Sequence, residues 1–315
     1  MADVDEALES PVVIRLQSVG LGNAFFQYAA AKAVAKANSA KVLFDISGCG
    51  ISSQLLGSQA QITQQDVLDH FARFRMKFGF ASPNIIRRLR RIPYQQGKWS
   101  SRIQRLVHRL GGMPQSYVKE RVIHQFQPEI LAFQAPVYLD GTFINPLYWS
   151  DISAEVLDDL TCIETLPEHL ESLRARMQDT PSIAIHIRRG DYANALTNST
   201  YPLYGDGYVR RAVAEIERRA GRCQYYIFSD DPQWARANIL VGSDAIHVSP
   251  QSPAAWADLE LMSSCQHNVI GNSTFSWWGA YRNKNPNRIV VVPRKWRNDA
   301  IDTSAMLQDG WIVLD

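Results

Sequence analysis

Short apolar runs alternate with helical stretches through the second half of the chain, and this alternation constrains the fold most. The expected strands are 182–187, 224–229, 244–249, 267–271 and 288–293. The expected helices between them are 206–220, 254–265 and 275–283. Such alternation predicts a doubly wound α/β domain with a parallel sheet, in which binding groups gather at the carboxyl ends of the strands.

The beginning of the chain follows the same pattern. A strand at 11–17 precedes the glycine-bearing stretch "SVGLGN", an alanine-rich helix that ends near Asn38, and a second strand at 41–47. Strand, helix and strand in this order form a βαβ unit. We therefore expect an α/β protein with a flexible tail at 1–10 and two Rossmann-like domains, 11–170 and 171–315, whose parallel sheets face a central cleft.

Charge and composition narrow the class of protein. The 33 basic and 31 acidic side chains leave a net charge of +2, so no global field favours nucleic acid. The four cysteines are scattered, which indicates neither a disulfide framework nor a zinc site. The acidic N-terminus lacks the order of a signal peptide, and no apolar run approaches the ~20 residues that span a bilayer. We expect a cytoplasmic protein.

One segment departs from this balance. Between Arg73 and Arg109 there are eleven lysines or arginines and no acidic residue, within a helical insertion expected at about 73–110. An exposed basic helix face explains this pattern. The alternative is peripheral contact with an anionic surface, such as a membrane.

The glycines of the first turn are a candidate binding element. Gly20, Gly22 and Asn23 lie between a strand and a helix, where backbone N–H groups can hold a phosphate or a sugar. Phe25 stands where a dinucleotide fingerprint has its third glycine, which argues against that fingerprint. A simple tight turn explains the glycines equally well.

The stretch "HIRRGDY" is more specific. His186 ends a strand, and Arg188 and Arg189 follow it, so that two guanidinium groups lie at the carboxyl end of the sheet. Their bidentate geometry suits a pyrophosphate. Gly190 allows a sharp turn, and Asp191 either holds an arginine or accepts a substrate proton. The alternative is an arginine pair neutralised by surface acids.

Polar residues also follow two later strands. Asp230 and Asp231 come directly after the strand 224–229, where a carboxylate can read the N–H edge of guanine or cap the next helix. The later stretch can cap a helix and face a phosphate through Asn272, Ser273, Thr274, Phe275 and Ser276. The following Trp277 and Trp278 are expected to pack against the sheet.

The sequence predicts neither a metal site nor a cofactor. The seven histidines are dispersed without metal-ligand spacing, and the only D-x-D pattern, Asp3 and Asp5, lies in the expected tail. Two further carboxylates, Asp45 and Asp140, lie at the ends of expected strands in the first half.

Together these motifs resemble the GDP-fucose-dependent α-1,2-fucosyltransferases, glycosyltransferase family 11. The resemblance rests on segments 19–35, 138–149, 186–192, 226–231, 258–281 and 288–296. The chain departs from the family pattern at "AFF" after "GLGN" and at "TFINPLYW" after "YLDG". Both departures lie in the half that the family uses for its acceptor, so they bear on acceptor identity.

The resemblance implies a GT-B fold and metal-independent, inverting transfer of fucose from GDP-fucose to the 2-hydroxyl of a terminal galactoside. It places Arg188 on the β-phosphate, with Arg189 beside it. Asp191 is either the proton acceptor or a residue that only holds the arginines, and Asp45 and Asp140 are rival candidates for the base on the acceptor side. Bacterial members build cell-surface polysaccharides on lipid-linked acceptors, which suits peripheral contact of 73–109 with the inner membrane.

Three alternatives remain open at this point. The first is another nucleotide-sugar transferase of GT-B architecture, and the second is an α-1,3-fucosyltransferase. The third is a nucleotide- or carbohydrate-binding module without catalysis, in which the tryptophan-rich stretches serve as stacking surfaces.

Overall fold

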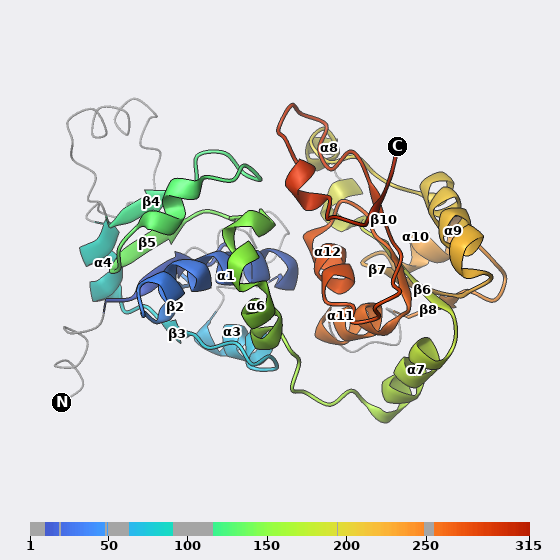
Figure 1. Ribbon diagram of the computed structural model, residues 1–315, viewed down its shortest axis with the longest axis horizontal. Helices are drawn as coiled ribbons and strands as arrows, with labels where there is room; N and C mark the ends of the chain where they lie inside the picture. Colours follow the sequence, from blue (N-terminus) through green and yellow to red (C-terminus); the bar gives the residue numbers. More distant parts are fainter. Residues whose placement is uncertain are drawn as a thin grey trace. The chain divides into compact units, whose positions relative to one another are not determined.

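The protein consists of two compact units (Figure 1). The computed structural model describes residues 10–18, 20–47, 49, 63–90, 116–193, 195–248 and 255–315. The units are Met1–Thr161 and Cys162–Asp315. The predicted boundary after residue 170 falls inside helix α7 (Glu168–Asp179), which contacts α11 (Ala255–Ser264) of the second unit. The predicted tail lies outside the described residues apart from Ser10.

The first unit contains a five-stranded parallel sheet in the order β3-β2-β1-β5-β4. Its strands are β1 (Val12–Arg15), β2 (Val42–Asp45), β3 (Gly79–Phe80), β4 (Tyr117–Lys119) and β5 (Val137–Asp140). Its helices are α1 (Leu21–Ala37), α3 (Gln64–Phe71), α4 (Pro83–Arg90) and α6 (Ser153–Asp159). Short 3-10 helices lie at Pro128–Ala132, Pro146–Tyr148 and Ser150–Ile152.

Helix α1 is buried on most of its surface, because apolar residues such as Phe25 and Phe26 recur around its whole circumference. It begins at Leu21, so Gly22 and Asn23 belong to its first turn and not to a loop. The Gln27 side chain donates hydrogen bonds to the carbonyl oxygens of Arg15, at 2.8 Å, and Gly141, at 2.7 Å. This amide therefore ties α1 to the carboxyl ends of β1 and β5.

The second unit contains a six-stranded parallel sheet in the order β11-β10-β9-β6-β7-β8. Its strands are β6 (Ser182–Ile187), β7 (Gln224–Ser229), β8 (Ile246–His247), β9 (His267–Val269), β10 (Val290–Pro293) and β11 (Ile312–Leu314). Besides α7 and α11, its helices are α8 (Ala195–Asn198), α9 (Asp206–Ala220), α10 (Pro232–Asn238) and α12 (Thr274–Tyr281). Short 3-10 helices lie at Gly190–Ala193 and Ser304–Met306.

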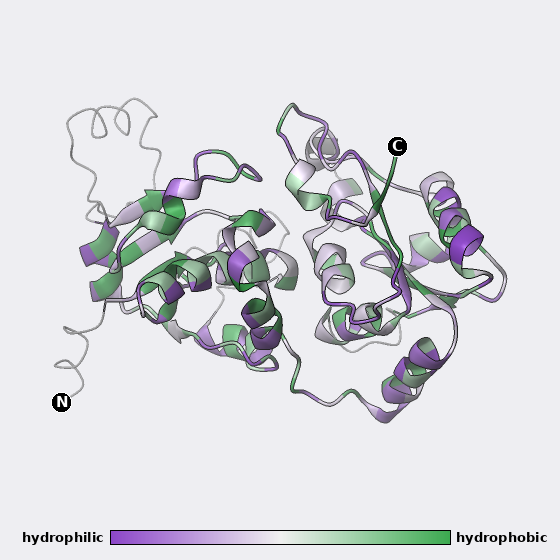
Figure 2. Ribbon diagram, in the orientation of Figure 1, coloured by the Kyte–Doolittle hydropathy of each residue, from purple (hydrophilic) through white to green (hydrophobic). Residues whose placement is uncertain are grey.

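The core of the second unit follows from amphipathic helices on an apolar sheet. Tyr208, Val209 and Ile216 of α9 pack with Ile183 and Ile185 of β6, and the outer side of α9 is hydrophilic (Figure 2). Both Trp277 and Trp278 are completely buried, as expected of core residues. The two parallel α/β domains predicted from the sequence are thus confirmed.

Each sheet has a topological switch point. The second unit runs outward from β6 through β7 to β8, and then continues on the other side of β6 with β9. In the first unit the corresponding switch lies between β1 and β5. Loops that leave adjacent strands in opposite directions open a crevice at the carboxyl edge, where ligands of open α/β sheets bind.

Candidate functional site

Arg188 lies at the switch point of the second unit, in the loop that follows β6. Its Nη1 forms an ion pair with Oδ2 of Asp230 at 2.8 Å, and the other oxygen of Asp230 accepts a hydrogen bond from the backbone N–H of Arg189 at 2.7 Å. One carboxylate at the end of β7 therefore holds both the guanidinium and the backbone of this loop. About a third of the Arg188 side chain is exposed, so it can reach a ligand.

The glycine after the arginine pair is required for a reason other than the predicted one. Gly190 begins a 3-10 helix, and its φ does not lie in the left-handed region. A Cβ at this position would lie only 2.4 Å from Oδ2 of Asp230. A side chain here would have to displace the Asp230 carboxylate, whereas the turn conformation itself does not require glycine.

The second arginine faces a different partner. The guanidinium of Arg189 lies over the ring of Trp234 in α10, 3.9 Å from the ring centroid. This is the geometry of a cation–π contact, which fixes the side chain against the helix. The side chain of Asp191, the expected partner of an arginine in this motif, lies outside the described part of the structure.

The two adjacent aspartates have different roles. Oδ1 of Asp231 accepts a hydrogen bond from the backbone N–H of Trp234 at 3.1 Å, so Asp231 is the N-cap of α10. This confirms the capping interpretation for Asp231. Asp230 is left as the carboxylate that faces the arginine loop.

The loop after β9 supplies the other side of the switch point. The buried amide of Asn272 donates hydrogen bonds to the carbonyl oxygens of Pro202 and Trp296, both at 3.1 Å. Ser273 occupies the N-cap position of α12, but its side chain caps no N–H group among the described residues. Ser276 donates to the carbonyl oxygen of Ser273 at 3.3 Å. The predicted side-chain cap is therefore wrong, and Asn272 joins three segments instead.

His186 is a buried neutral histidine beside this site. The residue is 6% exposed, its ring centroid lies 5.6 Å from that of Phe275, and its Nδ1 has no hydrogen-bond partner within the described part of the chain. Burial lowers the pKa of His186 to about 3, and the nearby Arg188 charge lowers it further in the same direction. The imidazole is therefore uncharged near neutral pH.

This histidine predicts a specific pH dependence of stability. Histidine in an unfolded chain titrates near 6.5. Between pH 6.5 and about pH 3 the unfolded state therefore binds a proton at His186 that the folded state does not bind. The free energy of unfolding should fall by about 1.4 kcal/mol for each pH unit below 6.5. In urea denaturation between pH 7 and 4, His186→Gln should flatten this slope. His169→Gln, an exposed control on α7, should not; equal slopes in all three proteins would contradict the assignment.

A second charged cluster lies at the switch point of the first unit. Arg15 pairs with Asp45 in the register of β1 and β2, and its Nη1 forms an ion pair with Oδ1 of Asp140 on β5 at 3.1 Å. The hydroxyl of Tyr117 donates to the other oxygen of Asp140 at 2.5 Å. Both expected acceptor-side carboxylates therefore lie at this edge, with Arg15 between their strands.

Two tyrosines hold these carboxylates. Tyr138 donates a hydrogen bond to Oδ2 of Asp45 at 2.5 Å and stacks on Tyr117, with ring centroids 5.7 Å apart. Burial, followed by the nearby aspartates, raises the pKa of both tyrosines far above 10, so both phenols remain donors. Asp45 is only 1% exposed and also accepts the backbone N–H of Ser47. Asp140 therefore presents the more accessible half of the cluster.

The loop after β5 is held by a carboxylate that the sequence analysis missed. Glu120 accepts hydrogen bonds from the backbone N–H groups of Thr142, at 2.7 Å, and Phe143, at 3.1 Å. A Cβ on Gly141 would lie 2.4 Å from Cβ of Glu120, and Phe143 adopts a φ of 49°. Arg15, Tyr117 and Tyr138 were also missed, although an arginine at the end of the strand "VVIR" was a visible signal.

The remaining predicted residues lie outside these two clusters, or their predicted role stays a prediction. Gly20, Gly22 and Asn23 belong to the first unit, and their proximity to a donor stays a prediction. Thr274 is the first residue of α12. Of the basic segment, residues 91–109 lie outside the described part, whereas Arg87 and Arg88 are exposed on α4.

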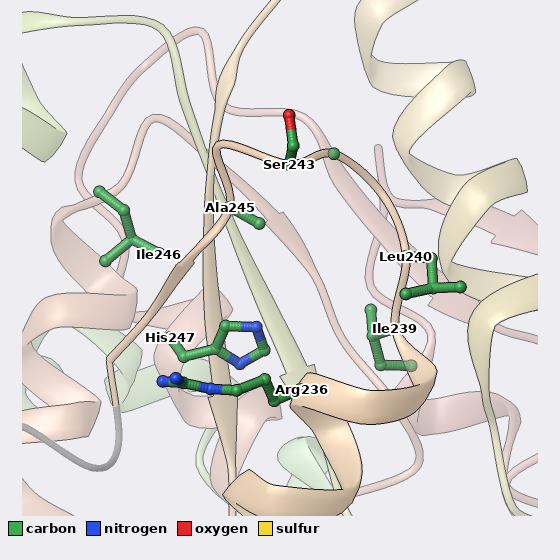
Figure 3. A pocket seen from close by; sticks show the side chains of 8 residues that line it. Arg236, Ile239, Leu240, Ser243, Ala245, Ile246 and His247 are labelled. Carbon is green, nitrogen blue, oxygen red and sulfur yellow. The ribbon is translucent and has the colours of Figure 1, made fainter.

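One open pocket lies apart from these clusters. It has a volume of about 570 Å³, and Arg236, Leu240, Ser243 and His247 line it between α10 and β8 (Figure 3). Burial, followed by the charge of Arg236, lowers the pKa of His247. The residues of the arginine loop do not line it. Among the described residues, no group of three or more metal-ligating side chains could hold an ion, and no described helix is long and apolar enough to cross a membrane.

The fold and the second switch point together define a class of protein. A parallel α/β domain presents Arg188, held by the carboxylate of Asp230, at the switch point where open α/β sheets bind ligands. Guanidinium groups recognise phosphate oxygens in pairs. Such an arrangement can bind a phosphorylated ligand.

Comparison with known proteins identifies the family. The sequence profile of glycosyl transferase family 11 matches residues 12–315. The chain belongs to this family, so the resemblance drawn from the motifs is confirmed.

Individual relatives cover the chain to different extents. The O-antigen biosynthesis glycosyltransferase WbnK of Escherichia coli is 36% identical over 140 residues, 44% of this chain and 46% of the relative. An α-1,2-colitosyltransferase of Escherichia coli is 22% identical over 311 residues, 97% of this chain and 99% of the relative. A galactoside α-(1,2)-fucosyltransferase 1 of Aotus azarae is 24% identical over 153 residues, 45% of this chain and 42% of the relative. The chain thus spans less than half of the first and third relatives.

Among solved structures, the fucosyltransferase NodZ from Bradyrhizobium is similar with a TM-score of 0.49 at 12% identity. The match covers 86% of this chain and 92% of NodZ.

Proposed function

We propose that this protein is an inverting α-1,2-fucosyltransferase that moves L-fucose from GDP-fucose to the 2-hydroxyl of a terminal galactoside. The observation that carries the proposal is the Arg188–Asp230 pair at the switch point of the second unit, in a chain of family 11. The names of two relatives, an α-1,2-colitosyltransferase and an α-(1,2)-fucosyltransferase, support the linkage.

The arginine supplies the electrostatic part of the reaction. The acceptor oxygen forms a bond to the anomeric carbon while the bond from that carbon to the β-phosphate oxygen breaks, and GDP leaves with the bonding electrons. Arg188 stabilises the charge that develops on the diphosphate, and Asp230 orients it before the substrate arrives. Each oxygen of Asp230 keeps a lone pair, which leaves it able to accept the guanine edge as well.

The proton of the acceptor hydroxyl needs a base, and Asp191 stays the predicted one. In Asp140 both oxygens already accept hydrogen bonds, one from Arg15 and one from Tyr117. Both oxygens are thus already engaged, and the adjacent guanidinium and carboxylate match two neighbouring sugar hydroxyls, one as acceptor and one as donor. We therefore assign Arg15 and Asp140 to acceptor binding.

The acceptor is proposed to be a lipid-linked glycan at the cytoplasmic face of a membrane. The basic segment 73–109 would contact that surface. Its described residues, 73–90, include the exposed Arg75, Lys77, Arg87 and Arg88.

One observation suggests GDP-colitose as a second candidate donor. The relative that matches almost the whole chain is a colitosyltransferase. Colitose is fucose without its 3-hydroxyl, so the two donors would use the same diphosphate contacts and differ only at this hydroxyl.

Direct transfer assays test the proposal. The purified protein is incubated with GDP-fucose or GDP-colitose and a panel of β-galactosides, and the linkage of the product is determined by NMR. We expect an α-1,2-fucosylated galactoside, with GDP-fucose used at least tenfold faster than GDP-colitose. The reverse preference would establish the colitosyl alternative, and an α-1,3 product would contradict the linkage. Binding of GDP without transfer to any acceptor would point to a binding module.

A further inference from the structure

Arg188 is the first member of a row of four stacked side chains. Its guanidinium lies over the ring of Tyr192, 5.6 Å from the centroid, and that ring stacks on Tyr201 with centroids 4.8 Å apart and an angle of 14°. The guanidinium of Arg297 lies over Tyr201, 4.9 Å from the centroid, and Nη1 of Arg297 donates a hydrogen bond to the Tyr201 hydroxyl at 2.7 Å. Each of the two nearly parallel rings thus contacts one cation.

The far end of this row is anchored. The Arg297 side chain is 8% exposed and forms an ion pair with Asp299, and its Nε donates to Oδ1 of that residue at 2.9 Å. The Arg188 side chain, at the near end, is 35% exposed. The row therefore runs from a buried, paired arginine to the accessible arginine of the switch point.

Backbone contacts bring the two segments together. The N–H of Asn298 donates to the carbonyl oxygen of Thr200 at 2.7 Å, and its side-chain amide donates to the carbonyl oxygen of Asn198 at 3.0 Å. Asn272 adds its bonds to Pro202 and Trp296. The segment after β10 therefore holds the end of the loop that begins at Arg188.

The stacked rings limit the directions in which the Arg188 side chain can point. The face of an aromatic ring attracts a cation, and offset stacking of two rings limits how far either can move. Two partners hold the Arg188 guanidinium: the carboxylate of Asp230 and the ring of Tyr192. Without the second contact, a side chain with this exposure gains rotamers that do not face the diphosphate.

We infer that Tyr192, Tyr201 and Arg297 are positioning residues that orient Arg188 toward the second phosphate of the donor. The inference rests on the proposed function, in which Arg188 contacts the β-phosphate. It deepens that function by assigning recognition of a diphosphate over a monophosphate to residues outside the "HIRRGDY" motif.

The ratio of GDP affinity to GMP affinity, measured by calorimetry on the full chain, tests this inference. Arg188→Gln should lower the ratio at least tenfold. Tyr201→Leu should lower it three- to tenfold, with GMP affinity within twofold of wild type, because GMP lacks the phosphate that Arg188 holds. Tyr201→Phe keeps the ring and should restore at least half of the ratio. Tyr204→Leu removes a similarly half-buried tyrosine that packs on Tyr208 outside the row, and should leave the ratio unchanged.

The outcomes test the inference separately from the proposed function of Arg188. An unchanged ratio in Arg188→Gln would overturn the phosphate role of Arg188 and the inference with it. A reduced ratio in Arg188→Gln with an unchanged ratio in Tyr201→Leu would overturn the inference alone, as would an equal loss of GDP and GMP affinity. If Tyr201→Leu does not fold, Arg297→Gln takes its place with the same expected reduction.

Discussion

Replacement of Arg188 by lysine should lower kcat for fucose transfer about 100- to 1,000-fold while the protein stays folded. Lysine keeps the charge but offers a point donor, so it cannot contact two phosphate oxygens and Asp230 in the fork geometry of a guanidinium. Loss of one preorganised donor at a developing anion costs about 2.7–4 kcal/mol of transition-state stabilisation. The measurement is single-turnover transfer from labelled GDP-fucose, with circular dichroism to verify the fold.

The control for this variant is Arg210→Lys. Arg210 lies on α9 of the same unit, is exposed, and pairs with Asp206 one helical turn away. Surface pairs of this kind contribute little, so its turnover should match wild type. Near-normal turnover in Arg188→Lys as well would remove the arginine from the mechanism.

Asp140→Asn should reduce kcat/KM for the galactoside about 10- to 100-fold and leave GDP affinity unchanged. The substitution removes the charge that orients Arg15 and the acceptor for Tyr117, and a hydrogen bond to a charged group is worth about 1.5–3 kcal/mol. GDP affinity should not change, because Arg188 and Asp230, which are proposed to hold GDP, belong to the second unit. Steady-state kinetics with varied acceptor and calorimetry with GDP separate the two effects.

A matched control exists within the same unit. Asp158 forms an ion pair with Arg75 at 2.8 Å, but both side chains are more than half exposed. Asp158→Asn should therefore leave acceptor kinetics unchanged. Parallel losses of GDP affinity and acceptor kcat/KM in Asp140→Asn would indicate general damage and count against acceptor binding.

The strands and helices of the second unit were predicted closely, and the reason is their periodicity. The strands 182–187 and 224–229 and the helix 206–220 have the observed limits. The strand expected at 244–249 is only Ile246–His247, because an edge strand pairs on one side and its ends lack partners. In the first unit β3 and β4 were not predicted, since they are short. The helical insertion expected at about 73–110 contains the strand β3 and the helix α4 among its described residues.

Local sequence could not distinguish residues that lie next to each other. Asp230 and Asp231 are chemically identical, and either could cap a helix or face a ligand. In the structure Asp231 caps α10, and Asp230 reaches across to the β6 loop and holds Arg188. Gly190 shows the same limit: the glycine was noticed, but its cause is the carboxylate of a neighbouring strand.

The sequence by itself determined the α/β class, the parallel sheets and the family, because apolar periodicity and the order of motifs are local properties of the chain. Only the tertiary structure decided which charges meet. Arg15 meets Asp140, and Arg188 is linked through two tyrosines to Arg297, across separations of about a hundred residues. Strand order sets these contacts: each sheet places its first strand at the centre, and groups from distant segments converge at the carboxyl edge beside it.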